Sequence, residues 1–240
     1  MSAAGAREVT VAIDAALRSV ADPAKAPAMA AYMKHHFAFL GVPKPQREAA
    51  TKQLVRALTF ADEADLQDLV LRLWAFPERE LHYVAIDVLV RHGALLTEAS
   101  APFLRQLIVS NSWWDSADGL VHVVGDGVVR FPSWVPIMRT WATDPNRWIR
   151  RLAILHQLGR KLDTDVDRLT EIVLLNASDP EFFIRKAIGW ALRDLAWSMP
   201  GLVVEIVHAN RTVLSPLSRR EALKNIEKIA AQGRMSTPKR

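Results

Sequence analysis

The middle of the chain holds side chains whose types and spacing could do chemistry. Two adjacent indoles, Trp113 and Trp114, are followed closely by two carboxylates, Asp115 and Asp118. A carboxylate can stabilise positive charge or move a proton, and an indole face attracts cations. What these groups can do together depends on the elements that position them.

A turn signal recurs along the chain and predicts those elements. Each signal is a residue pair just before an amphipathic segment, and successive pairs are 34, 34, 34, 35 and 36 residues apart. Pro at a helix start, with Asp or Ser before it, follows from helix capping. The pairs are Val42-Pro43, Phe76-Pro77, Ser110-Asn111, Asp144-Pro145, Asp179-Pro180 and Ser215-Pro216. We therefore expect the second helices of a repeat to begin near residues 43, 77, 111, 145, 180 and 216.

The apolar pattern predicts an all-α chain. Apolar residues recur at i, i+3 and i+4 nearly throughout, and no segment alternates as a strand would. A 34-residue helical period indicates a HEAT-like helical-repeat solenoid, an α-α superhelix with a concave binding face. We expect one domain over residues 1–230 and a basic tail at 231–240. Chance alignment of the 13 prolines is the alternative, which the shared patterns at 148–151 and 183–186 oppose.

The repeat places the unusual side chains on equivalent faces. Positions 3, 6, 7 and 10 after each turn residue form one stripe of a helix. The stripe holds Trp114 and Asp118 in one unit, Arg151 in the next, and Lys186 and Trp190 in the third. With helices 8–10 Å apart the patch would extend about 20 Å, comparable to the width of a nucleic-acid duplex. The alternatives are an Asp118–Arg151 ion pair of purely structural value and, for Trp134, Trp141 and Trp197, core packing.

Composition excludes several classes of chemistry. The chain has no cysteine, which removes disulfides, Cys-ligated metals and thiol catalysis. No stretch reaches the length of a membrane span and the N-terminus lacks a signal pattern, so we expect a soluble, cytoplasmic protein. The net charge of +5 is concentrated in residues 211–240, which carry eight Lys/Arg and two Glu and suit a polyanion.

Five segments in order resemble the AlkD-like family of DNA alkylation repair glycosylases, over roughly residues 28–226. They lie at residues 32–42 (YMKHHFAFLGV), 112–118 (SWWDSAD), 151–155 (RLAIL), 182–193 (FFIRKAIGWALR) and 217–222 (LSRREA). The resemblance implies an active site of Trp114, Asp118, Arg151 and Trp190, the positions that the stripe also selects. It implies a DNA partner, for which we expect further contacts from Trp113, Lys34, Arg185, Lys186, Arg193, Arg219 and Arg220.

The implied activity is hydrolysis of the N-glycosidic bond of cationic N3- or N7-alkylated purines in double-stranded DNA. Such a base is already a good leaving group, so catalysis moves to the sugar, which becomes oxocarbenium-like. We expect Asp118 to stabilise that charge, Trp114 and Trp190 to favour the charged nucleotide, and Arg151 to grip a phosphate. We expect a monomeric, monofunctional glycosylase that leaves an abasic site and uses no metal and no cofactor.

Two other functions fit parts of the sequence. A noncatalytic HEAT-like scaffold for DNA or protein is the main alternative, because such repeats are usually binding surfaces. An unpaired acid facing a polyanion would argue against it. A hydrolase of free nucleosides or nucleotides would need a closed pocket, which an open solenoid does not obviously supply.

Overall fold

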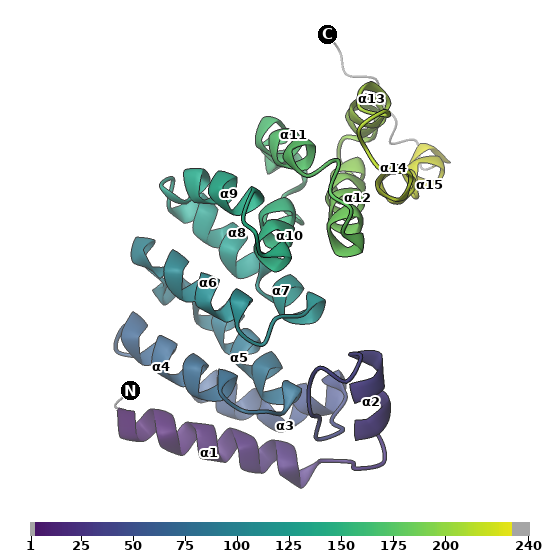
Figure 1. The fold of residues 1–240 in the computed structure, drawn as a ribbon. Coiled ribbons are helices and arrows are strands. Elements are labelled where there is room, and N and C mark those ends of the chain that lie inside the picture. Colours follow the sequence, from purple (N-terminus) through teal and green to yellow (C-terminus); the bar gives the residue numbers. More distant parts are fainter. Residues whose placement is uncertain (1–2, 232–240) are drawn as a thin grey trace. The chain divides into compact units, whose positions relative to one another are not determined.

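The computed structural model describes residues 3–231 (Figure 1), and over this range it contains helices and no strand. The predicted all-α class is confirmed. The chain forms two compact units, Met1–Phe103 and Leu104–Arg240. The predicted basic tail at 231–240 lies, apart from Ala231, outside the described residues. The single-domain boundary of 1–230 stays a prediction.

The first unit is built on α1, α4 and α5, which pack on one another. In α4 the residues Leu66, Leu69 and Leu73 have no exposed surface, as their helical spacing predicts. Asp62 caps this helix by accepting a hydrogen bond from the amide of Asp65. The elements are α1 Ala3–Ser19, α2 Ala26–Tyr32, α3 Lys44–Ala57, α4 Glu63–Trp74, α5 Arg79–His92, the short 3-10 helices Gly93–Leu95 and Glu98–Ser100, and α6 Ala101–Val109, which runs across the boundary of the unit.

A buried carboxylate fixes the loop that precedes α3. Glu80 on α5 has no exposed surface and accepts hydrogen bonds from the amides of Leu40, Gly41 and Val42, at 3.1, 3.0 and 3.0 Å. These three amides would otherwise lack partners, and an unmatched buried amide is costly. The end of the 32–42 segment, which the sequence singled out, is therefore held by α5.

The second unit stacks its second helices in chain order: α7 packs on α10, α10 on α12, and α12 on α14. Trp134 and Trp141 lie in its core, as expected, whereas Trp197 is partly exposed. The elements are α7 Trp114–Gly119, α8 Val121–Arg130, α9 Trp134–Ala142, α10 Arg147–Leu155, the 3-10 helix Lys161–Asp163, α11 Val166–Leu175, α12 Phe182–Ala196, α13 Pro200–Ala209, α14 Pro216–Leu223 and α15 Ile226–Ala231.

The helices after the six turn signals begin at Lys44, Arg79, Trp114, Arg147, Phe182 and Pro216. Each start lies within three residues of the turn residue that marks it in the sequence. Asn111, the one turn residue that is not Pro, has a φ of +52°, a left-handed conformation that Asn tolerates better than most residues. The turn at Asn111 thus keeps the period of the repeat without a proline.

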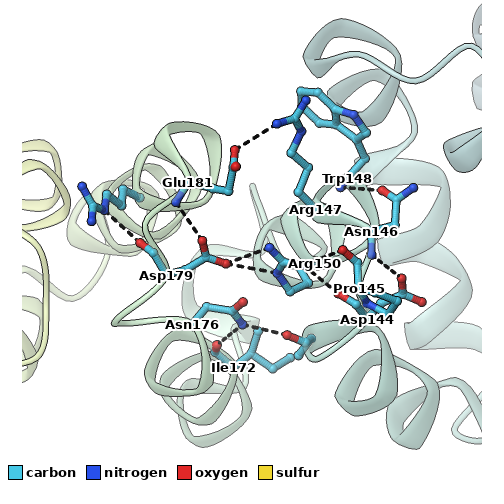
Figure 2. A network of polar contacts seen from close by, with 12 residues as sticks. Asp144, Pro145, Asn146, Arg147, Trp148, Arg150, Ile172, Asn176, Asp179 and Glu181 are labelled. Atoms are coloured by element: carbon cyan, nitrogen blue, oxygen red, sulfur yellow. Dashed lines mark hydrogen bonds and ion pairs between the residues drawn. The ribbon is translucent and has the colours of Figure 1, made fainter.

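Polar contacts tie one repeat to the next at two equivalent turns (Figure 2). Oδ1 of Asp144 accepts from the amide of Asn146 at 2.7 Å, and Oδ1 of Asp179 accepts from the amide of Glu181 at 2.8 Å. Arg150 joins the two turns, because Nη1 donates to the carbonyl of Asp144 at 2.7 Å and Nη2 to Oδ2 of Asp179 at 2.8 Å. The boundary between these two repeats is therefore fixed by directional bonds as well as by apolar packing.

Candidate active site

Asp118 lies at the end of a short helix whose start is fixed locally. The hydroxyl of Ser116 accepts from the amide of Trp113 at 3.3 Å and lies 3.4 Å from the carbonyl of Asn111, so the turn and the first turn of α7 form one bonded unit. Ser116 and Ala117 are buried beneath it. Trp114 and Asp118 are four residues apart on this helix, so they lie on the same face one turn apart, and both are partly exposed.

Arg151 from α10 binds Asp118 through a two-pronged ion pair. Nε donates to Oδ1 and Nη2 donates to Oδ2, both at 2.8 Å. Nη1 of the same guanidinium donates to the carbonyl of Phe183 on α12 at 2.6 Å. The side chains of Arg151 and Asp118 are 7% and 16% exposed. One guanidinium therefore orients the carboxylate against a third helix, while an edge of the carboxylate stays accessible.

Burial and the ion pair act on the pKa of Asp118 in opposite directions. Burial raises the pKa of this carboxyl above the ordinary value of 3.8, and the hydrogen bonds and charge of Arg151 oppose the rise. The neighbouring carboxylate of Asp115 adds a smaller increase. Charge-assisted hydrogen bonds to both oxygens favour the ionised form of a carboxylate. Arg151 therefore limits the rise in pKa that burial produces.

Aromatic rings border the pair. The guanidinium carbon of Arg151 lies 5.9 Å from the ring centroid of Trp190 and 6.0 Å from that of Phe183. Trp190 is partly exposed on α12. The structure thus brings Asp118, Arg151 and Trp190 together, as the stripe predicts, and puts Trp114 one helical turn from the carboxylate.

Trp113 belongs to a packed aromatic cluster. Its ring lies 5.5 Å from the ring of Trp148 and 5.5 Å from that of Phe183, and those two are 5.0 Å apart, all measured between centroids. Such tilted and edge-to-face pairs stabilise a core. Trp113 thus packs α7 against α10 and α12 while staying partly exposed, and the DNA contact expected for it stays a prediction.

Three of the residues expected to contact phosphate form ion pairs inside the protein. The guanidinium of Arg151 is buried and donates three N–H groups to partners inside the protein. Lys186 and Arg193 both pair with Glu221 of α14, with Nζ to Oε1 at 3.0 Å and Nη1 to Oε2 at 2.5 Å. The hydrogen bond from Lys186 is the main cause of the lowered pKa of Glu221. These two cations join α12 to α14, and for all three residues the DNA contact stays a prediction.

The other expected phosphate contacts keep some exposure. Arg220 is exposed, and Arg185 and Arg219 are partly exposed, all in the second unit. Lys34, in the first unit, is exposed and has a φ of +57°. For these four residues the DNA contact stays a prediction.

The sequence reasoning missed two contributors. The carbonyl of Phe183 is a backbone group, so no residue type could reveal it. Glu221 could have been found, because its partner Lys186 lies 35 residues earlier, close to the repeat period, and Asp118 and Arg151 are separated by 33. Among residues 3–231 no cluster of three or more His, Asp or Glu side chains is arranged to hold a metal ion. In that range no helix has the length and apolarity needed to cross a membrane.

Comparison with known proteins identifies the family. Residues 13–226 match the model of the DNA alkylation repair enzyme family. The chain belongs to the DNA alkylation repair enzyme family. A solved structure described as a predicted DNA alkylation repair enzyme from Enterococcus faecalis is 34% identical, covers 85% of this chain and 95% of its own, and superimposes with a TM-score of 0.78. Among curated proteins no match is found.

Membership of this family gives the protein a role in the repair of alkylated DNA. The match includes all three helices that supply the Asp118–Arg151–Trp190 group, because residues 13–226 span α7, α10 and α12. The candidate active site is therefore part of the region that defines the family.

Proposed function

We propose that this family member is a monofunctional DNA glycosylase that hydrolyses the N-glycosidic bond of cationic N3- or N7-alkylated purines in duplex DNA. The observation that supports it most is the oriented, partly accessible carboxylate of Asp118, held on both oxygens by Arg151. A fixed, partly desolvated carboxylate stabilises developing positive charge better than a mobile carboxylate in water, because it does not have to reorient during the reaction.

Each residue of the group has a role in this proposal. As the base leaves, the deoxyribose gains oxocarbenium character, and Asp118 stabilises that charge and orients the attacking water. Arg151 is a positioning residue, which holds Asp118 ionised and in place rather than contacting phosphate. Trp114 and Trp190 present indole faces to the cationic nucleotide, a contact worth roughly 0.5–2 kcal/mol each. The substrate in this proposal is alkylated duplex DNA, and the product is an abasic site in that duplex.

A noncatalytic DNA-binding scaffold is the second candidate, and one observation favours it. Asp118 is paired, so it no longer opposes a polyanion as an isolated charge and could be a purely structural partner of Arg151. The two functions differ in whether the base is released, not in whether DNA is bound.

Excision of 7-methylguanine from methylated duplex DNA separates them. We expect the purified protein to release the base and Asp118→Asn to slow release at least about 100-fold, with duplex affinity kept or increased because a negative charge is lost. Asp126→Asn is the matched control. Asp126, like Asp118, pairs with an arginine, here one in the loop that follows α10, but the side chain of Asp126 is largely exposed. Unchanged release by Asp118→Asn, with the fold intact by circular dichroism, would remove the proposed mechanism.

A further inference from the structure

Arg185 occupies the same place in its repeat as Arg150, yet it lacks half of the contacts. Both residues lie six positions after the aspartate of a turn, Asp144 for one and Asp179 for the other. Each donates to the carbonyl of its own aspartate, Arg150 at 2.7 Å and Arg185, through Nε, at 2.8 Å. Arg150 also reaches forward and pairs with the carboxylate of Asp179 in the next turn.

The next turn along the chain has no carboxylate for Arg185. Where the repeat would supply a third aspartate, the turn has Ser215 before Pro216, and the Ser215 hydroxyl caps α14 at the amide of Ser218. This turn contacts the backbone of Arg185 through Ser218. Oγ of Ser215 lies 2.8 Å from Oγ of Ser218, which donates to the carbonyl of Arg185 at 3.0 Å.

The guanidinium of Arg185 is thus oriented but not neutralised. Nε is fixed on the carbonyl of Asp179, and within residues 3–231 no carboxylate pairs with this arginine. Its terminal nitrogens have no hydrogen-bond partner in that range and are not buried. A planar guanidinium held at one edge, with its other donors open to solvent, is preorganised to bind the two oxygens of a phosphate.

Several cations of this unit differ from Arg185 in having a carboxylate partner. Ion pairs with protein carboxylates hold Arg105, Arg139, Arg147, Arg150, Arg151, Lys186 and Arg193, the last two sharing Glu221. The interruption of the repeated contact at Ser215 leaves Arg185 outside this set. We infer that Arg185 is a backbone-phosphate contact for duplex DNA, created by the missing third aspartate. This inference rests on the proposed function for its choice of polyanion.

Binding of an unmodified duplex oligonucleotide as a function of salt tests the inference. Arg185→Gln should reduce the slope of log Kd against log salt by about 0.9 and weaken binding about tenfold at low salt. Arg139→Gln, which removes the same charge from an arginine already paired with Glu171, should leave the slope at the wild-type value.

A second variant supplies the missing carboxylate. Ser215→Asp keeps a good helix cap and introduces a carboxylate at the repeat position that Asp179 occupies for Arg150, so it should weaken duplex binding. If the carboxylate acts by pairing with Arg185, adding it to Arg185→Gln should leave the salt slope of that variant unchanged.

A wild-type salt slope in Arg185→Gln, or full affinity in Ser215→Asp, would overturn the inference. Weakened binding by both variants, together with no base release by the wild-type protein, would instead support this contact while refuting the glycosylase. Failure of the wild-type protein to bind the duplex would refute both.

Discussion

Replacing Arg151 by methionine should destabilise the protein through the charge it leaves behind. Arg151→Met keeps an unbranched side chain of similar length but removes two hydrogen bonds to Asp118 and one to the carbonyl of Phe183. Breaking a buried ion pair by removing one partner costs about 3–5 kcal/mol, because the other charge stays desolvated. Asp118 keeps 16% exposure, so we expect the lower end, about 3 kcal/mol.

Equilibrium unfolding in urea at neutral pH measures this loss. Arg139→Met is the matched control, because Arg139 and Glu171 form an ion pair whose side chains are 57% and 40% exposed, and such a pair contributes about 0–1 kcal/mol. In the double variant Asp118→Asn/Arg151→Met the stranded charge is gone, so part of the stability should return. If Arg151→Met were no more destabilising than Arg139→Met, the buried pair would not have the energetic role derived from its geometry.

Arg151→Met should also change the pH dependence of excision. Without Arg151, burial and Asp115 remain, and both raise the pKa of Asp118. Since the proposed role needs the ionised carboxylate, excision should be lost on the acid side, and the acid limb of its pH profile should move to higher pH in Arg151→Met. An acid limb that stayed in place would indicate that another group controls it.

Two further predictions concern the core of the second unit. Burial lowers the pKa of His156 to about 4 from 6.5, so the folded state prefers the neutral ring; stability is full above pH 6.5 and should fall by roughly 3 kcal/mol as pH drops to about 4. Urea unfolding at pH 7 and about pH 5 checks this, and an equal pH dependence in His156→Gln would contradict it. A Cβ on Gly189 would lie 2.4 Å from Cβ of Glu221 and 2.9 Å from the carbonyl of Ser218, so Gly189→Ala should cost about 1–3 kcal/mol. Gly93→Ala, where no atom lies within 4 Å, is its control, and equal unfolding midpoints for the two variants would show that α14 moves aside without penalty.

The sequence predicted the period of the fold because turn chemistry is local. Pro216 begins α14 and Ser215 before it caps that helix, whereas Pro145 and Pro180 lie two residues before α10 and α12. Counting positions from each turn residue also predicted that Asp118 and Arg151 lie on equivalent faces of their helices. Their direct contact was left as one of two alternatives, because helix register fixes the face of a residue but not its partner.

Charge pairing was the least predictable part of the site. Lys186 and Arg193 look like phosphate contacts in the sequence, but both pair with Glu221 on a helix that begins 30 residues after Lys186. Whether a cation is available depends on the side chains that the next repeat brings beside it. Partners separated by about one repeat, such as Arg147 and Glu181 or Asp118 and Arg151, are a signal that could be searched for in a periodic sequence.

The bond from Arg151 to the Phe183 carbonyl makes the site a property of the second helices of three consecutive repeats, α7, α10 and α12, rather than of one helix. A repeat protein can gain or lose a unit by duplication or deletion and still bury its apolar surfaces, since each unit meets only its neighbours. Here, one extra helix pair inserted between α10 and α12 would preserve that stacking yet separate the guanidinium from its anchoring carbonyl. The number of units on either side can drift during evolution, whereas the order of these three cannot change without dismantling the carboxylate's support.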